Sequence, residues 1–163
     1  MTRAASSVDV PTAEGPRTPG YPPTLVDEGT DPMTSPAADG SEVRLLVPAQ
    51  SRFLRLARLT AAGLAGDLGY SLDEIEDLRI AIDELSAVAI DGAAEGALLT
   101  ICYREVDGSL HVQGSCPHPA AEPPELHVVA RELLEMLADG YVIDGGGGVR
   151  TFELVKRTGV GTT

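Results

Sequence analysis

The clearest pattern of apolar residues lies between residues 71 and 91, where apolar side chains recur at intervals of three or four. This spacing places them on one face of an α-helix, and they are Ile75, Leu78, Ile82, Leu85 and Ala89. Ser71 and Glu74 precede this face as a capping box, in which the Ser hydroxyl accepts a backbone N–H and the Glu reaches back to the cap. We therefore expect a helix that begins after Ser71 and ends near Asp91, before the chain breaker Gly92.

Shorter apolar patterns predict five strands and two more helices. The strands are expected over residues 42–47, 97–106, 109–114, 141–144 and 149–156, and the helices over 51–68 and about 124–139. Asp107-Gly108 predicts a hairpin, and the glycine run 145–148 predicts a flexible turn between the last two strands. The order β-α-α-β-β-α-β-β predicts an α/β (α+β) two-layer sandwich, with a mixed, mostly antiparallel sheet covered by helices on one face.

Residues 1–41 show neither a helical nor a strand period. They hold seven of the twelve prolines, and the rest are mostly Ser, Thr, Gly, Ala and acids. Such a segment cannot bury enough apolar surface to offset the entropy lost on ordering it. We therefore predict a disordered Pro-rich tail over 1–41, a folded domain over 42–157 and a flexible C-terminus over 158–163.

The composition narrows the classes of partner. A net charge of −13 and a pI near 4.4 argue against binding to nucleic acid or to anionic membranes, because both need a basic surface. No apolar run approaches the roughly 20 residues of a membrane span, and the first residues lack the apolar core of a secretory signal. We expect a cytoplasmic protein. Its acidic excess is compatible with a basic protein partner, although such an excess more often serves solubility.

Glu84 is the residue of the 71–91 helix that is best placed for chemistry. It lies with Asp77, Ala81 and Val88 on a line beside the apolar face, at the edge of the buried stripe. It could act as a general base, or it could be a helix acid that pairs with Arg79 or Arg104. A metal site is not expected, because Cys116-x-His118 alone is not one of the paired ligand sets that zinc requires.

Two motifs carry a resemblance to a known family. Residues 78–84 read Leu-Arg-Ile-Ala-Ile-Asp-Glu and are followed by Ala89-Ile90, and residues 147–154 form a Gly-rich turn and closing strand. With the order of elements, these motifs resemble the anti-sigma-factor serine kinases, whose domain is of the histidine-kinase and gyrase ATPase type. The resemblance covers roughly residues 42–157.

The resemblance implies a nucleotide pocket, and this chain departs from it at several places. In the family a Glu acts as general base, and an Asn one helical turn later binds Mg²⁺; Glu84 matches the first, but Val88 stands in place of the Asn. The family-equivalent pocket residues are Asp83, Glu84, Val88, Gly114, Gly147 and Thr151. The family's Asp-x-Gly-x-Gly is missing from residues 114–122, and Glu125-Leu126-His127 replaces a Gly-Leu-Gly that faces phosphate.

The resemblance with these departures implies an anti-sigma-like regulatory protein that works by protein contact. Its expected partners are a sigma factor, an anti-sigma-factor antagonist or both, with a possible homodimer through the first strand and helix; ATP binding and kinase activity are expected to be lost. The alternatives are an active serine/threonine kinase that uses ATP and Mg²⁺ with Glu84 as base, and a structural subunit that shares only the fold. A cleft open beside Glu84 would favour nucleotide binding, and a cleft plugged by proline and apolar residues would not.

Overall fold

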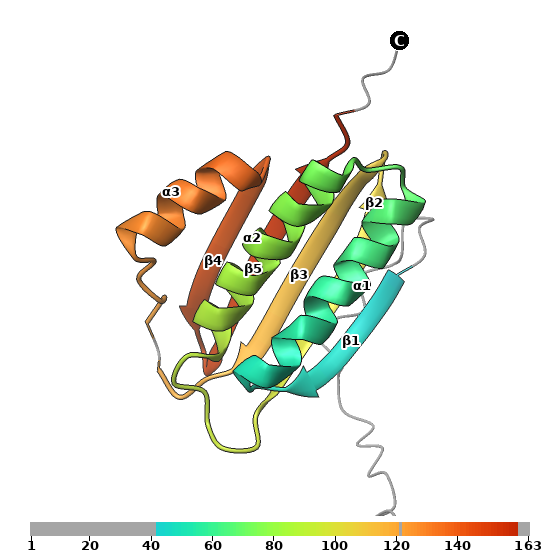
Figure 1. Cartoon of the computed structure of the whole chain (residues 1–163). Helices are drawn as coiled ribbons and strands as arrows, with labels where there is room; N and C mark the ends of the chain where they lie inside the picture. Colours follow the sequence, from blue (N-terminus) through green and yellow to red (C-terminus); the bar gives the residue numbers. More distant parts are fainter. Residues whose placement is uncertain (1–41, 121, 160–163) are drawn as a thin grey trace, which may run out of the picture. The chain divides into compact units, whose positions relative to one another are not determined.

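The computed structural model describes residues 42–120 and 122–159, which form an antiparallel sheet covered by helices (Figure 1). The strands are β1 (Glu42–Pro48), β2 (Leu98–Val106), β3 (Ser109–Pro117), β4 (Gly140–Gly146) and β5 (Val149–Arg157). Their order in the sheet is β1-β2-β3-β5-β4, with every neighbouring pair antiparallel. A 3₁₀ turn (Ser51–Phe53) leads into α1 (Leu54–Asp67), followed by α2 (Leu72–Ile90) and α3 (Val128–Leu137).

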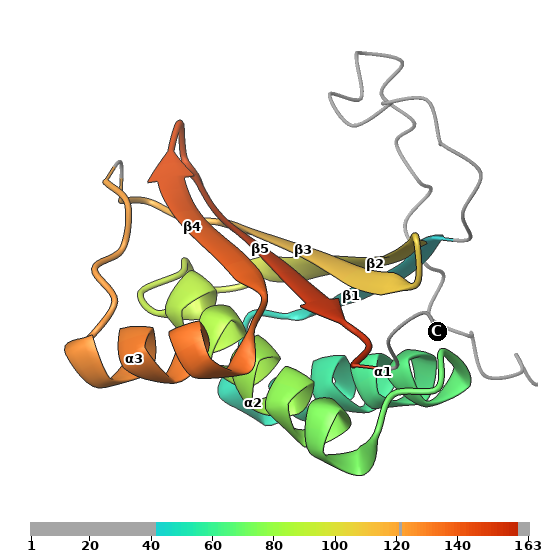
Figure 2. The same ribbon diagram turned by 90° about the horizontal axis from the view of Figure 1, so that it is seen from above.

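The helices lie on one face of the sheet, as Figure 2 shows, so the predicted fold class and element order are confirmed. The apolar face predicted for α2 is buried: Leu78, Ile82, Leu85 and Ala89 are fully inaccessible to solvent. Alternate residues of the central strands meet that face, because successive side chains of a strand point to opposite sides of the sheet. These include Ile101, Tyr103, Val112, Phe152 and Leu154. None of the helices in the described ranges is long and apolar enough to cross a membrane.

Three predicted bounds are wrong by a few residues. The last helix begins at Val128 rather than near Pro124. The preceding backbone instead packs on β4, where a Cβ at Gly145 would lie 2.8 Å from the carbonyl oxygen of Glu122. Strand β3 continues to Pro117, and the turn between β4 and β5 is only Gly147-Gly148, both with positive φ. Residues whose composition alone indicates a loop can still extend a strand, because hydrogen bonds to the neighbouring strand satisfy their backbone groups.

The predicted tail over 1–41 lies outside the described residues, and so do residues 160–163 of the predicted flexible C-terminus. The sheet begins at Glu42 and ends at Arg157. Just beyond it, the backbone N–H of Gly159 donates to the Glu74 carboxylate at the start of α2.

Tyr70 connects two strands through its hydroxyl, and we expect Tyr70→Phe to destabilise the protein by about 1–2 kcal/mol. The hydroxyl accepts from the N–H of Leu110 at 2.9 Å and donates to the carbonyl of Lys156 at 2.6 Å. Leu110 and Lys156 are register partners of β3 and β5, and the side chain of Tyr70 is buried. Its loss leaves buried backbone groups unpaired. Urea unfolding measures the effect, and an equal change in Tyr141→Phe, whose hydroxyl bonds to no described residue, would contradict this role.

Acid should weaken the start of α2 through Glu74. The backbone and side chain of Ser71, and then the N–H of Gly159, lower the pKa of Glu74 below its ordinary 4.5. A carboxyl with a lowered folded pKa gives stability that is present above the unfolded value and is lost as the pH falls through the folded value. From about pH 7 to about pH 3, Glu74→Gln should therefore lose less stability than the wild type. Equal losses in urea unfolding, or the same protection in the exposed control Glu95→Gln, would contradict the assignment.

Candidate functional site

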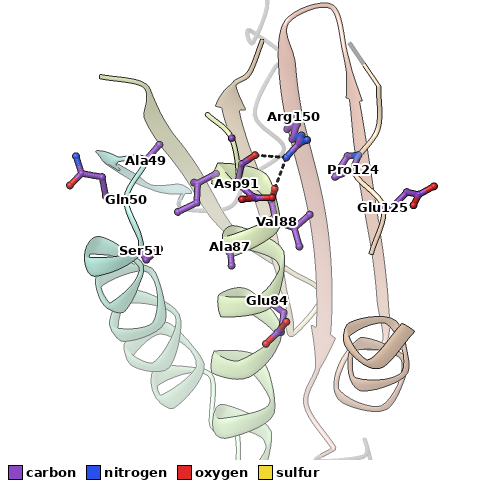
Figure 3. Close-up of a pocket in the computed structure, with 12 residues that line it drawn as sticks. Ala49, Gln50, Ser51, Glu84, Ala87, Val88, Asp91, Pro124, Glu125 and Arg150 are labelled. Carbon is purple, nitrogen blue, oxygen red and sulfur yellow. Dashed lines mark hydrogen bonds between the residues drawn. The ribbon is translucent and has the colours of Figure 1, made fainter. Parts of the chain in front are cut away.

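A cleft of about 560 Å³ opens at the C-terminal end of α2 (Figure 3). One wall is the segment that enters the 3₁₀ turn, another is the end of α2, and the third comes from β5 and the segment before α3. Its lining residues are Ala49, Gln50, Ser51, Glu84, Ala87, Val88, Ile90, Asp91, Gly92, Pro124, Glu125 and Arg150. The cleft is not plugged, and both Pro124 and Glu84 are among the residues of its walls.

Glu84 and Val88 both line the cleft from α2, one helical turn apart, as their spacing predicts. Glu84 is half-buried. Glu84 forms no ion pair with the arginines named for it among the described residues, where Arg79 contacts Glu76 at 2.7 Å and Arg104 contacts Glu42 at 2.5 Å. Glu84 lines this cleft and also the groove between α1 and α2 that Arg79 lines.

Arg150 closes the end of α2, a role that the sequence analysis missed. Its Nη1 donates to the carbonyl of Val88 at 3.0 Å and to that of Asp91 at 2.7 Å (Figure 3). These are carbonyls that the helix itself leaves unpaired, and a cation at a helix C-terminus also offsets the negative end of the helix dipole. The sequence does carry a signal for this position. Arg150, Phe152 and Leu154 are each two residues apart in β5, so all three point to the face of the sheet that the helices cover.

His118 contacts the same carbonyl of Asp91 that Arg150 contacts. Its Nε2 lies 2.7 Å from the carbonyl oxygen of Asp91, and its Nδ1 accepts from the N–H of Ala120 at 3.0 Å. This geometry fits the neutral ring with its proton on Nε2. The ring is buried, and Gly92 leaves room for it, since a Cβ there would lie 3.3 Å from His118 Nε2. His118 thus ties the segment after β3 to α2.

The structure does not bring the other predicted pocket residues into this cleft. Asp83 lies in the groove between α1 and α2, where Arg58 contacts it at 2.5 Å. Gly114 lies under the ring of Phe152, and Gly147 is in the β4–β5 turn. Thr151 pairs with Ser115 on the sheet face that the helices leave uncovered, since its neighbours Arg150 and Phe152 point to the helices.

Negative charge dominates the cleft. Glu84, Asp91 and Glu125 line it, against the one cation Arg150. Among residues 42–120 and 122–159, none of these three carboxylates belongs to an ion pair. The carbonyl end of α2 adds partial negative charge to the same place.

The position one turn after Glu84 offers no side-chain ligand to Mg²⁺. A hard cation needs oxygen ligands, and Val88 offers none from its side chain. The main-chain oxygen of Val88 is already bonded to Arg150, and the surrounding carboxylates would repel a polyphosphate.

The chain is similar in sequence to known serine-protein kinases. It is 34% identical over 71 residues to the serine-protein kinase RsbW of Halalkalibacterium halodurans, a match that covers 43% of this chain and 44% of that protein. It is 43% identical over 51 residues to the RsbW of Bacillus subtilis, covering 31% of this chain and 32% of that protein. The chain thus spans less than half the length of these curated relatives. No protein-family model matches it.

The fold is also similar to a solved one. The crystal structure of the RsbU and RsbW domains of a Mycobacterium tuberculosis protein aligns with a TM-score of 0.56 and 17% sequence identity. The alignment covers 72% of this chain and 32% of that one. At this identity, the likeness concerns the fold alone.

Proposed function

We propose that the chain is an anti-sigma-like regulatory protein that acts by binding a protein partner, and its similarity to the serine-protein kinases RsbW supports this proposal. Following the family, the partner is a sigma factor, an anti-sigma-factor antagonist or both. ATP binding and kinase chemistry have been lost, so the protein is a binding module rather than an enzyme. It needs no bound cofactor, and it works in the cytoplasm.

One observation carries the loss of activity: Val88 faces the cleft one turn after Glu84. Phosphoryl transfer depends on a divalent cation that neutralises the charge developing on the phosphate. Here an apolar side chain stands where the cation's ligand would be, and Arg150 holds the neighbouring carbonyls. Glu84 alone could accept a proton from a hydroxyl, but nothing beside it would hold the phosphates.

Without phosphorylation, release of a bound partner must come from competition. Two proteins that share one surface exclude each other, and the one with the larger product of concentration and affinity prevails. An antagonist would then free a sigma factor by occupying the regulator, with no covalent step.

Calorimetric titration of the full chain with ATP and Mg²⁺ tests the proposal. We expect no saturable heat up to about 1 mM ATP, which corresponds to binding weaker than about −4 kcal/mol. Val88→Asn restores an oxygen ligand but leaves the acidic lining, so it should remain without saturable binding. Micromolar binding by the wild type would contradict the loss of nucleotide binding.

The open cleft favours a second candidate, an active kinase with altered metal ligation. In that case Glu84 would accept the proton of a substrate serine, and Glu84→Gln would abolish transfer. The discriminating measurement incubates the chain and an antagonist with labelled ATP. Label that enters the antagonist with wild type but not with Glu84→Gln would establish the kinase.

A further inference from the structure

We propose that the cleft at the end of α2 receives a basic side chain, arginine or lysine, from the protein partner. The proposal rests on the proposed function and names the chemistry that the partner presents to this cleft. In the free protein the cleft is open, its lining bears more negative than positive charge, and its carboxylates bond to no cation among the described residues.

The charges favour a cation and disfavour an anion. Glu84 lies on the α2 wall, Asp91 follows the helix, and Glu125 stands on the rim across the cleft (Figure 3). Together with Arg150 they leave a net of two negative charges around the opening. Arg150 forms no ion pair with these carboxylates among the described residues, and its Nη1 is bonded instead to two main-chain carbonyls. A guanidinium or ammonium group from outside would meet carboxylate oxygens free to accept its N–H groups.

The apolar part of the lining suits the stem of the same side chain. Ala87, Val88 and Pro124 form apolar surface between the carboxylates. Arginine and lysine bury their methylene stems along such surface and keep the charged head among polar groups. A bare metal ion would leave this surface uncovered. Moreover, no three His, Cys, Asp or Glu side chains in the described part of the chain gather closely enough to hold one.

Val88 gains a purpose in this arrangement. As a replacement for a metal-binding side chain, it removes one polar group from the wall and leaves an apolar contact beside Glu84. A cleft that would bind phosphate through Mg²⁺ thereby becomes a cleft that binds the cationic side chain of a partner directly.

The test is a titration of the ¹⁵N-labelled full chain with N-acetyl-arginine amide, followed by NMR. We expect saturable shifts of residues 84–92, 125 and 150, with a Kd on the order of millimolar because one side chain contributes few contacts. The triple variant Glu84→Gln, Asp91→Asn, Glu125→Gln should bind at least about tenfold more weakly. The control Glu95→Gln, Glu105→Gln, Glu135→Gln removes the same charge elsewhere and should bind as the wild type does.

Two results would overturn the inference. One is shifts scattered over the acidic surface without saturation, and the other is an equal loss of binding in the two triple variants. The substitutions are nearly isosteric and lie on partly or fully exposed residues, so folding is checked by the unshifted core resonances of each variant. Failure of the proposed function is a separate result. It would show as micromolar ATP binding in calorimetry, irrespective of the outcome of the N-acetyl-arginine amide titration.

Discussion

Gly114→Ala should destabilise the protein by about 3 kcal/mol, the upper part of the range for overpacked cores. A Cβ at this position would lie 2.0 Å from Cε1 of Phe152 and 2.3 Å from its Cζ, far inside van der Waals contact. Phe152 is 1% exposed and fixed between the sheet and α2, so the ring cannot move away without opening the core. The measurement is urea unfolding of the purified variant.

A matched pair of variants separates this steric cause from a general effect of losing a glycine. Gly63 is an exposed position of α1 where a Cβ would meet nothing within 4 Å. Gly63→Ala should therefore stabilise by up to about 1 kcal/mol. Adding Phe152→Leu to Gly114→Ala should recover part of the loss, because the smaller side chain leaves room. A double variant that is the exact sum of its single changes would show that the ring is not the cause.

Arg150→Met should cost about 2 kcal/mol, since it removes charge-assisted hydrogen bonds to two carbonyls at the end of α2. The carbonyl of Asp91 keeps its bond to His118, so the loss falls mainly on Val88. We expect urea unfolding to report the change, and hydrogen exchange to rise in the last turn of α2 before the rest of the helix.

Arg55→Met is the control for the lost charge. Arg55 is exposed on α1 and belongs to no ion pair among the described residues. Its removal should change the stability by less than about 0.5 kcal/mol. Arg150→Lys should fall between the wild type and Arg150→Met, because an ammonium keeps the charge but lacks the forked geometry of the guanidinium. Equal effects of Arg55→Met and Arg150→Met would contradict the capping role.

The parts of the fold predicted correctly depend on local chemistry. The capping box of α2 forms as its two residues indicate, and the buried face of that helix follows its spacing. Asp107-Gly108 makes the turn between β2 and β3, with positive φ at both residues. Such signals need only neighbours in the chain, so a single sequence displays them.

Other features depend on register and on distant contacts, which a single sequence does not display. The nucleotide residues implied by resemblance included Thr151, whose side of the sheet follows from its pairing with Ser115. The late start of α3 reflects packing on Gly145, more than twenty residues away from Pro123. The helix-facing position of Arg150 could have been seen in the alternation of β5, but its acceptors on α2 could not.

The position of β5 in the sheet sets the order in which the domain can be completed during synthesis. It is the last strand along the described chain, yet it lies between β3 and β4. Until it leaves the ribosome, β4 has no neighbour among the described strands, and the inner edge of β3 stays unpaired. The nascent chain therefore presents an open strand edge that can pair wrongly, and native assembly must wait for residues 149–157.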